Sequence, residues 1–417
     1  MNVWLITVGE PLPRLSSDSR LWRVGLLAQE LAARGHAVTW WTSRVDHFNK
    51  RFFDWTERDF PVMPGLTIRF LDGILYRRNV GMARLFNHWQ VAREFERLAV
   101  AAPVPAVILS SFPTIELSAA AVQYGKEHGI PVVLDVRDLW PDIFVQAVPG
   151  PLRGFLRMVL HGYFASTRRA LAGAASLIAV SRGYLQWGID RAGRAARAED
   201  RVFPLAYSLP GRTDAARNAG REWLANYGVN DASVVCLFAG TLGRTYDLAP
   251  VLDAARAFAA VNGSPFRFVI CGDGERAAEW REKARGLSNV AFTGWLDQAR
   301  MRDALMGADI GLAAYAHAAP QGLPNKVIEY MAAGLPVVSS LAGETADLLK
   351  RGDCGVSYAA GDDEALRDAL ERLAAPQPRA RLAHNARHGF EAEFVAETIY
   401  PQLASYLERA ANANSRP

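Results

Sequence analysis

The sequence predicts an α/β protein with two doubly wound parallel-sheet domains, and three observations support this fold class. The chain has 417 residues and 50% hydrophobic content, which is too much for one ordinary core. Short apolar runs alternate with amphipathic helical patterns along most of the chain, which is typical of βα units that build parallel sheets. The series of such units restarts after the turn at Pro210 and Gly211. We therefore expect domains at residues 1–204 and 205–390.

Each domain is expected to contain five or six buried strands. In the first they are residues 3–8, 37–42, 66–71, 106–110, 132–135 and 176–180, and in the second 234–239, 266–271, 290–293, 310–314 and 337–339. Residues 390–410 are expected to form one terminal helix, kinked at Pro401, and residues 391–417 to cross back onto the first domain. Two such domains would create a cleft at the carboxyl ends of their strands, where open α/β sheets bind ligands.

Composition and charge restrict the setting. Cys236, Cys271 and Cys354 are too far apart for a disulfide framework or a zinc knuckle, which favours a reducing cytoplasm. No stretch reaches the roughly 20 apolar residues of a membrane span, and the first strand lacks a basic leader, so any membrane contact is expected to be peripheral. Lys and Arg minus Asp and Glu gives 25 − 18 = +7 for residues 1–204 and 22 − 25 = −3 for the rest, which suggests an anionic partner for the first half. No nucleic-acid motif accompanies this charge.

The most informative segment is residues 309–340, a strand, a loop, a helix and another strand. A loop that opens a helix presents free backbone N–H groups and a positive dipole end, which suits phosphate. Asn325 is expected to cap this helix and Lys326 to add a charge in its first turn. Glu329, one turn further on, is placed to accept hydrogen bonds from both hydroxyls of a ribose. A capped strand-loop-helix is also common for purely structural reasons.

The run PNKVIEYMAAGLPVV, which begins at Pro324, resembles the E-x7-E region of retaining glycosyltransferases of family 4. These enzymes have two Rossmann-like domains in the GT-B arrangement. The resemblance implies a retaining, metal-independent transferase that uses a nucleoside diphosphate sugar, with UDP as the expected nucleotide and no cofactor. One position departs from the motif, because Gln321 replaces its first glutamate. Gln321 can hydrogen-bond a sugar hydroxyl, but it cannot offset the charge of an oxocarbenium-like centre.

Three further loops resemble the donor loops of this family. Glycines after a strand let the backbone approach an anion closely, although such turns are also ordinary strand ends. The resemblance implies that the first loop and Arg244 hold the diphosphate, and that the last loop lies beside the nucleobase. The expected donor residues are Gly240, Thr241, Gly243, Arg244, Gly272, Gly274, Trp295, Leu296, Gln321, Asn325, Lys326 and Glu329.

In the first domain, charged residues follow directly on a buried strand in the run LDVRDLWPD, which contains Arg137 and Asp138. A simple Arg137–Asp138 ion pair is one interpretation, but burying charge there is costly without a purpose. The run resembles the Arg-Asp-Leu-Trp-Pro signature of transferases that build O-antigen and capsule units, such as N-acetylfucosaminyl transferases. We therefore expect Arg137, Asp138 and, in the first βα loop, Asp18 and Arg20 to receive the acceptor.

The expected catalytic groups are Asp138, Lys326 and Arg244, with no metal site. Asp138 would orient the acceptor hydroxyl, and the two cations would stabilise the departing diphosphate. The acceptor is expected to be a sugar or a polyprenyl-diphosphate-linked sugar in surface polysaccharide or lipopolysaccharide synthesis. Two alternatives remain open at this point: a sugar-nucleotide epimerase of the same shape, and a catalytically silent scaffold that binds sugar nucleotides.

A basic, apolar segment suggests a further partner. Residues 152–169 mix large apolar residues with Arg153, Arg157, Arg168 and Arg169. Such a helix is suited to an anionic membrane surface at the inner face of the cytoplasmic membrane. The competing interpretation is a helix that covers the sheet with its arginine stems.

Overall fold

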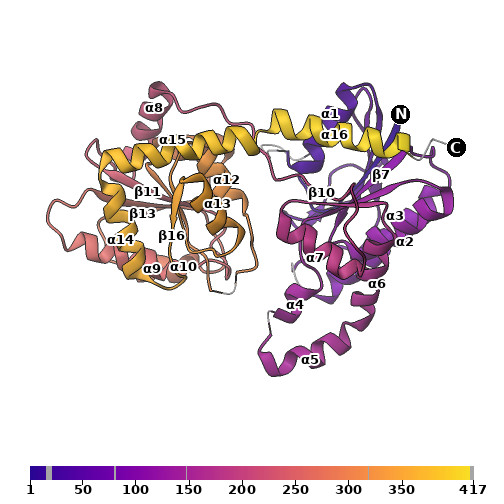
Figure 1. The fold of residues 1–417 in the computed structure, drawn as a ribbon, viewed down its shortest axis with the longest axis horizontal. Coiled ribbons are helices and arrows are strands. Elements are labelled where there is room, and N and C mark those ends of the chain that lie inside the picture. The colour runs from indigo at the N-terminus through magenta and orange to yellow at the C-terminus, as the bar shows by residue number, and fades with distance from the viewer. Residues whose placement is uncertain (16–20, 79–80, 147, 318, 414–417) are drawn as a thin grey trace. The chain divides into compact units, whose positions relative to one another are not determined.

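The computed structural model describes residues 1–15, 21–78, 81–146, 148–317 and 319–413, and the chain divides into two compact units. Unit 1 consists of Met1–Pro204 together with Glu397–Pro417, and unit 2 of Leu205–Ala396. The chain thus passes between the units twice. In unit 2 the two crossing segments are paired, because the amide of Tyr207 donates to Phe394 at 3.0 Å and the amide of Ala396 donates to Tyr207 at 2.9 Å. Each unit is a sheet with helices on both faces (Figure 1).

The sheet of unit 1 has eight strands in the order β10-β9-β8-β7-β1-β2-β6-β5, parallel except for β5, which runs antiparallel to β6. From β1 the chain builds outward in one direction through β2 and β6 and in the other through β7, β8 and β9, which is the doubly wound pattern. The strands are β1 (Asn2–Ile6), β2 (Ala37–Ser43), β5 (Asp59–Met63), β6 (Leu66–Leu71), β7 (Val107–Phe112), β8 (Val132–Val136), β9 (Ser176–Ala179) and β10 (Arg201–Val202). A separate hairpin pairs β3 (Val45–Asp46) with β4 (Arg51–Phe52).

Helices cover both faces of this sheet because its central strands are apolar on both sides. On one face Trp4, Trp41 and Leu134 pack against α2, α3, α6 and α7. The helices α1 and α16 are joined by Arg34, which follows α1 and donates hydrogen bonds to Pro401 and Ser405 of α16. The helices are α1 (Arg23–Ala33), α2 (Met82–Ala99), α3 (Ile115–His128), α4 (Asp142–Gln146), α5 (Gly150–Val159), α6 (His161–Gly173), α7 (Arg182–Ala192) and α16 (Ala396–Ala413).

The sheet of unit 2 has six parallel strands in the order β13-β12-β11-β14-β15-β16. Its direction of winding reverses between β11 and β14, so the loops after these two strands leave the same edge at the switch point. The strands are β11 (Val234–Ala239), β12 (Phe266–Cys271), β13 (Val290–Gly294), β14 (Ile310–Ala313), β15 (Val337–Ser339) and β16 (Gly355–Ser357).

Two apolar clusters bury the two faces of the second sheet. One joins β-strand residues to α8, α11, α12, α13 and α15, and the other to α9, α10 and α14. The helices are α8 (Asp214–Ala225), α9 (Ala249–Ala259), α10 (Ala277–Lys283), α11 (Gln298–Gly307), α12 (Asn325–Ala332), α13 (Glu344–Gly352), α14 (Asp363–Ala374) and α15 (Pro376–Glu393).

The terminal helix differs from the sequence-based expectation. A single helix over 390–410 is wrong, because α15 ends at Glu393 and α16 begins at Ala396. Phe394 and Val395 interrupt them, since their backbone groups pair with the Tyr207 segment instead of continuing the helix. Pro401 lies inside α16. No helix in the described ranges is long and apolar enough to cross a membrane.

Candidate functional site

The carboxyl edge of the second sheet is built from three loops that are joined backbone to backbone. The amide of Gly240 donates to Cys271 at 2.9 Å, and the amide of Gly272 donates to Gly294 at 2.8 Å. A third bond of 2.9 Å runs from the amide of Leu242 to Asp273. The loops after β11, β12 and β13 therefore form one connected surface.

Gly272 is required for this close approach. Its φ of +137° is one that other residues rarely adopt, and an added Cβ would lie 1.9 Å from the carbonyl oxygen of Gly240. Gly274 is similar, with a φ of +158° and a Cβ position 2.7 Å from the carbonyl oxygen of Leu242. Gly243 differs, because a Cβ there would meet nothing within 4 Å. Gly272 and Gly274 thus allow the loops to pack closely together.

Lys326 lies directly beneath the first of these loops. A Cβ on Gly240 would lie 2.8 Å from the Lys326 Nζ, which is the closest heavy atom to that position. The side chain is 5% exposed, and its Nζ has no hydrogen-bond partner among the described residues. Burial lowers the pKa of Lys326 well below its usual value, and the charge of Glu329 only partly opposes this shift. A buried ammonium without a partner suits a site that receives an anion.

Three aromatic rings surround the same ammonium. Its Nζ lies 3.7 Å from the ring centroid of Tyr246, 3.9 Å from that of Phe238 and 5.2 Å from that of Tyr315. Such contacts partly compensate a desolvated cation. The loops after β11 and β14 that bring Tyr246 and Tyr315 together also pair in a short antiparallel bridge. Sequence reasoning missed this cage, although two tyrosines near glycine-rich loops could have suggested it.

The start of α12 corrects one expectation. Asn325 is not the N-cap: Pro324 occupies that position, and Asn325 is the exposed first residue of the helix. Proline has no side-chain oxygen that could accept a hydrogen bond from the first amides of the helix, so no side-chain cap forms. Further along the helix, the Tyr330 hydroxyl accepts from the amide of Ala239 at 2.8 Å and donates to Leu312 at 3.0 Å. Tyr330 thereby fixes α12, and with it Lys326 and Glu329, against the ends of β11 and β14.

The remaining donor candidates differ in exposure and in hydrogen-bond partners. Arg244 is exposed, with 87% of its side chain accessible, and forms an ion pair with Glu275 at 3.2 Å. Trp295 is 75% exposed, whereas Leu296 packs against the core. Gln321 is half-buried, and its Oε1 has no partner within the described residues. Thr241 is exposed on the loop between Gly240 and Gly243.

In unit 1, Arg137 belongs to a buried ion network. Its Nε donates to Asp135 at 2.7 Å, and its Nη1 donates to Glu10. Asp135, which is fully buried, also accepts from Arg23 at 2.8 and 3.1 Å. Glu10 accepts from the amide of Val24 at 3.0 Å in the first turn of α1. The alternative interpretation, a simple Arg137–Asp138 ion pair, is therefore wrong: Arg137 pairs with Asp135 and Glu10, although its Nη2 is buried without a partner in the described chain.

Asp138 follows this network and is partly buried. Burial raises the pKa of its carboxyl group, while hydrogen bonds from the Leu139 amide, at 2.8 Å, and from Trp140 oppose the shift, as does the charge of Arg84. The carboxylate is thus costly to keep ionised at this place. Its position after β8 puts it at the carboxyl edge of the first sheet.

A group of titratable side chains that sequence reasoning missed lies near Asp138. The Arg84 guanidinium lies 4.9 Å from the Trp140 ring and donates to His88 at 3.4 Å. Burial lowers the pKa of His88 to about 3 and that of His47 to about 4, and in both cases the charge of Arg84 adds to the effect. Arg84 and His88 lie on α2, whereas His47 follows β3 and Asp138 follows β8, so only the fold brings these three regions together.

The two remaining acceptor candidates, Asp18 and Arg20, lie outside the described residues.

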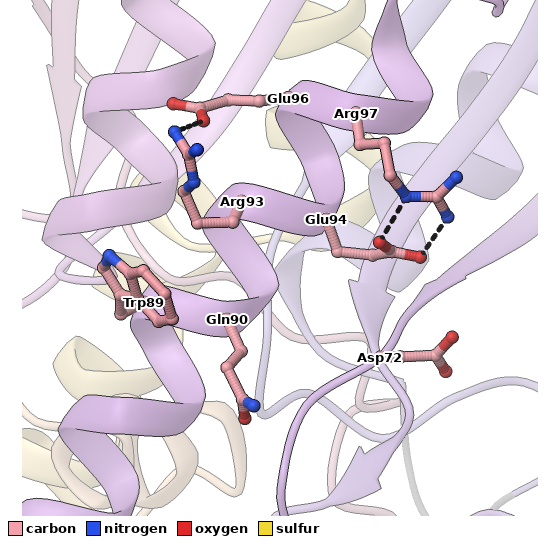
Figure 2. A pocket seen from close by; sticks show the side chains of 7 residues that line it. All are labelled: Asp72, Trp89, Gln90, Arg93, Glu94, Glu96 and Arg97. Atoms are coloured by element: carbon pink, nitrogen blue, oxygen red, sulfur yellow. Dashed lines mark hydrogen bonds and ion pairs between the residues drawn. The ribbon is translucent and has the colours of Figure 1, made fainter.

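A pocket on α2 lies apart from the candidate residues (Figure 2). Within it Glu94 pairs with Arg97 at 2.7 Å and Arg93 with Glu96 at 2.8 Å. The third carboxylate of the lining, Asp72, pairs with Arg44 and Arg58, so each acidic group already has an arginine partner, and no predicted site residue lines the pocket. Within the described ranges, no group of three or more His, Cys, Asp or Glu side chains is arranged to hold a metal ion.

Comparison with known families finds one match in each half of the chain. Residues 22–206 match the family described as glycosyl transferase 4-like domain, and residues 233–375 match glycosyl transferases group 1. The amylovoran biosynthesis glycosyltransferase AmsK of Erwinia amylovora is 34% identical over 156 residues, which are 36% of this chain and 38% of that protein. The lipopolysaccharide core biosynthesis glycosyltransferase LpsE of Rhizobium meliloti is 29% identical over 134 residues, 31% of this chain and 38% of that protein. The chain thus spans under two-fifths of the length of these curated relatives.

Solved structures show the fold over nearly the whole chain. Sucrose-phosphate synthase from Thermosynechococcus elongatus superposes with a TM-score of 0.75 at 18% identity, covering 99% of both chains. HepE from Anabaena, solved in complex with UDP-glucose, superposes with a TM-score of 0.66 at 16% identity, covering 98% of this chain and 100% of that one. WaaG, described as a glycosyltransferase involved in lipopolysaccharide biosynthesis, gives a TM-score of 0.64 at 15% identity over 98% of this chain and 99% of that one. These superpositions confirm the predicted GT-B fold class, and the two family matches lie one in each half of the chain, at residues 22–206 and 233–375.

Proposed function

We propose that this protein is a retaining glycosyltransferase of family 4 that moves a sugar from a nucleoside diphosphate to an acceptor in surface polysaccharide or lipopolysaccharide synthesis. The observation that carries the proposal is the buried Lys326 ammonium beside Gly240, which has no hydrogen-bond partner among the described residues and lies at the edge where three glycine-containing loops meet. The match to two glycosyltransferase domains supports this assignment, as do the names of the polysaccharide relatives.

On the donor side, Lys326 and the amides of residues 240–243 would bind the diphosphate, with Arg244 released from Glu275 to join them. Glu329 would accept hydrogen bonds from the ribose hydroxyls, and Trp295 would lie against the base. UDP is the proposed nucleotide, since HepE was solved with UDP-glucose on the same fold. The transferred group is a hexosyl or N-acetylhexosaminyl sugar, and the Arg-Asp-Leu-Trp-Pro run favours an N-acetylfucosaminyl type.

The reaction needs no metal or cofactor in this proposal. The bond between the anomeric carbon and the diphosphate breaks, and its electron pair leaves with the diphosphate, stabilised by Lys326 and Arg244. The acceptor oxygen attacks the same face of the sugar, and its proton passes to an oxygen of the leaving β-phosphate. Asp138 would accept a hydrogen bond from the acceptor hydroxyl and orient it. Gln321 would hydrogen-bond the donor sugar without supplying charge.

The acceptor is proposed to be a sugar linked to polyprenyl diphosphate, presented on the cytoplasmic side. The three free cysteines are buried and agree with that setting without testing it. Arg137 would contribute its buried Nη2, the one nitrogen of its guanidinium without a partner in the described chain, to acceptor binding.

Calorimetric titration with UDP, GDP and ADP, followed by transfer assays with lipid-linked acceptors, tests this function. Glu329→Ala should abolish UDP binding at concentrations that saturate the parent protein, whereas Glu364→Ala, an exposed position on α14, should not. Asp138→Asn should keep UDP affinity and lower turnover about 100-fold or more. Full transfer activity in both site variants would refute the assignment.

The same assay separates the two alternatives. An epimerase would change the sugar of the donor without any acceptor, and a silent scaffold would bind the donor but release no UDP with any acceptor. The transferase should release UDP only when an acceptor is present. The anomeric configuration of the product, measured by NMR, should match that of the donor if the reaction retains configuration.

A further inference from the structure

The helix α5 exposes an unusual amount of apolar surface. Leu152 is 53% exposed, Phe155 64%, Met158 67% and Val159 59%, and none of the ten residues of Gly150–Val159 is buried. A helix that belongs to a core normally buries its apolar face. This helix therefore has a large apolar face that the described residues of unit 1 do not cover.

The surroundings of α5 show the same isolation. Its substantial contacts within the described chain are with its chain neighbours α4 and α6. Figure 1 shows α5 at the far end of unit 1, away from the sheet. A Cβ on Gly154 would meet nothing within 4 Å. The expected alternative, a helix that covers the sheet with its arginine stems, is therefore wrong for α5.

The apolar and basic residues of α5 lie on different sides. At about 100° per residue, Leu152, Phe155, Met158 and Val159 fall within an arc of about 120°, while Arg153 and Arg157 each lie about 100° beyond one edge of that arc. This division is the pattern of helices that lie in a membrane interface, with the apolar side chains among the acyl chains and the cations at the headgroups.

The charge of the region identifies the partner. Residues 150–173 contain Arg153, Arg157, Arg168 and Arg169 and no Asp or Glu. Arg153 donates to backbone carbonyls of Gln146 and Val148 and Arg169 to Ser166, so these bonds do not neutralise their charges. Two copies of this surface would repel each other, which argues against self-association through α5. An anionic lipid headgroup offers the complementary charge.

We propose that α5 docks this protein on an anionic membrane, with Leu152, Phe155, Met158 and Val159 inserted and Arg153 and Arg157 at the headgroups. The docking does not depend on the proposed sugar transfer, although it would hold unit 1 at the surface where a lipid-linked acceptor is found. It requires only vesicles and the full chain for its test.

Co-sedimentation with vesicles of phosphatidylcholine alone or with 30% phosphatidylglycerol, a probe composition of about one anionic lipid in three, measures the docking. The parent protein should bind only the anionic vesicles. Leu152→Ser/Phe155→Ser/Met158→Ser should abolish binding, and Arg153→Gln/Arg157→Gln should weaken it about 30-fold. Matched controls in the same unit, Val100→Ser/Val104→Ser and Arg77→Gln/Arg78→Gln, replace exposed residues and should bind like the parent.

A label on α5 reports insertion without removing the apolar face. The native cysteines are all buried, so a polarity-sensitive maleimide dye should react selectively with Met158→Cys. Its emission should shift to shorter wavelength with anionic vesicles, whereas the same dye on Val261→Cys, exposed in unit 2, should not respond.

Three results would overturn the proposal: equal binding to neutral vesicles, unchanged binding of the triple serine variant, or a dye on α5 that remains in water. A dimer in light scattering that the triple variant makes monomeric, with no vesicle binding by the parent, would assign α5 to a second copy instead. UDP binding by each variant shows that it is folded if the proposed donor site is right, and circular dichroism shows this independently.

Discussion

Replacing Lys326 with methionine should separate donor binding from stability. Methionine keeps most of the length of the side chain and removes the charge. Because Lys326 Nζ has no hydrogen-bond partner in the described chain and is 5% exposed, the change breaks no hydrogen bond or ion pair seen in the structure. It should therefore leave the fold intact and affect only what the ammonium is placed to bind.

The magnitudes follow from the surroundings of the ammonium. Loss of one charge-assisted contact with a diphosphate costs about 1.5–3 kcal/mol, which is about a 10- to 150-fold loss of UDP affinity. The fold should gain stability, because replacing a buried ion with an apolar residue is often favourable by about 1–4 kcal/mol. The three aromatic contacts of Lys326 reduce this gain by about 0.5–2 kcal/mol.

The sign of the pH dependence gives an independent test. The folded pKa of Lys326 is lowered below 10.5, so the unfolded chain binds more protons between the two values, and stability should rise with pH in that window. Lys326→Met should remove this rise. Diphosphate binding should raise the pKa again, so UDP binding by the parent protein should take up protons, measurable as a dependence of the calorimetric heat on the buffer.

Guanidinium unfolding and calorimetric UDP titration test these predictions together, with Lys350→Met, an exposed position on α13, as the control. A Lys326→Met protein that binds UDP like the parent but loses more than about 2 kcal/mol of stability would show that the lysine is structural. That outcome would refute the argument from its missing partner.

Three further predictions concern other residues. Gly272→Ala should cost at least about 2 kcal/mol of unfolding free energy and abolish UDP binding, because the added Cβ would overlap the carbonyl oxygen of Gly240. Gly243→Ala has room for its Cβ and should change little, so equal effects of the two variants would contradict this prediction. Asp135→Asn should destabilise unit 1 by about 3–5 kcal/mol in thermal and denaturant unfolding, because it leaves Arg23 and Arg137 without their shared carboxylate. A loss of less than about 1 kcal/mol would show that this ion network does not stabilise the unit. The pKa of His88 is lowered from 6.5 to about 3, so the unfolded chain binds more protons between these values and the stability of the fold should fall as the pH drops from 6.5 toward 3. The slope is at most about 1.4 kcal/mol per pH unit, and His88→Gln should flatten it. An unchanged slope would show that His88 is not its cause.

The parallel sheets could be predicted because their strands are continuous apolar runs between helical patterns. Residues 234–239 and 266–271 were predicted at the bounds that β11 and β12 have. The antiparallel edge strand at 59–63 was not predicted, because its alternating pattern contains Pro61 and only pairing with β6 makes it a strand. The break between α15 and α16 also escaped prediction, since its cause is pairing with Tyr207, nearly two hundred residues earlier in the chain.

In the candidate site, too, residues in short motifs could be predicted, whereas contacts between distant residues could not. Lys326 and the glycines could be found because they lie in short contiguous motifs at the start of a helix or the end of a strand. The aromatic cage joins Phe238 in β11, Tyr246 in the following loop and Tyr315 after β14, and the long sequence separation of Tyr315 from the other two hides it. Arg137 was placed correctly at a strand end, but its ion pair with Glu10 was not predicted, because Glu10 reaches it from the first loop.

The double passage of the chain between the units makes unit 2 an insertion within unit 1. Residues 205–396 are contiguous in the gene, and their entry and exit are hydrogen-bonded to each other at Tyr207 and Ala396. Unit 2 can therefore be cut out as a single fragment whose ends already meet, whereas unit 1 is assembled from two separate stretches of the polypeptide. A ribosome must finish α16 before unit 1 is complete, so the unit that carries Asp138 and α5 closes only after unit 2 has been made.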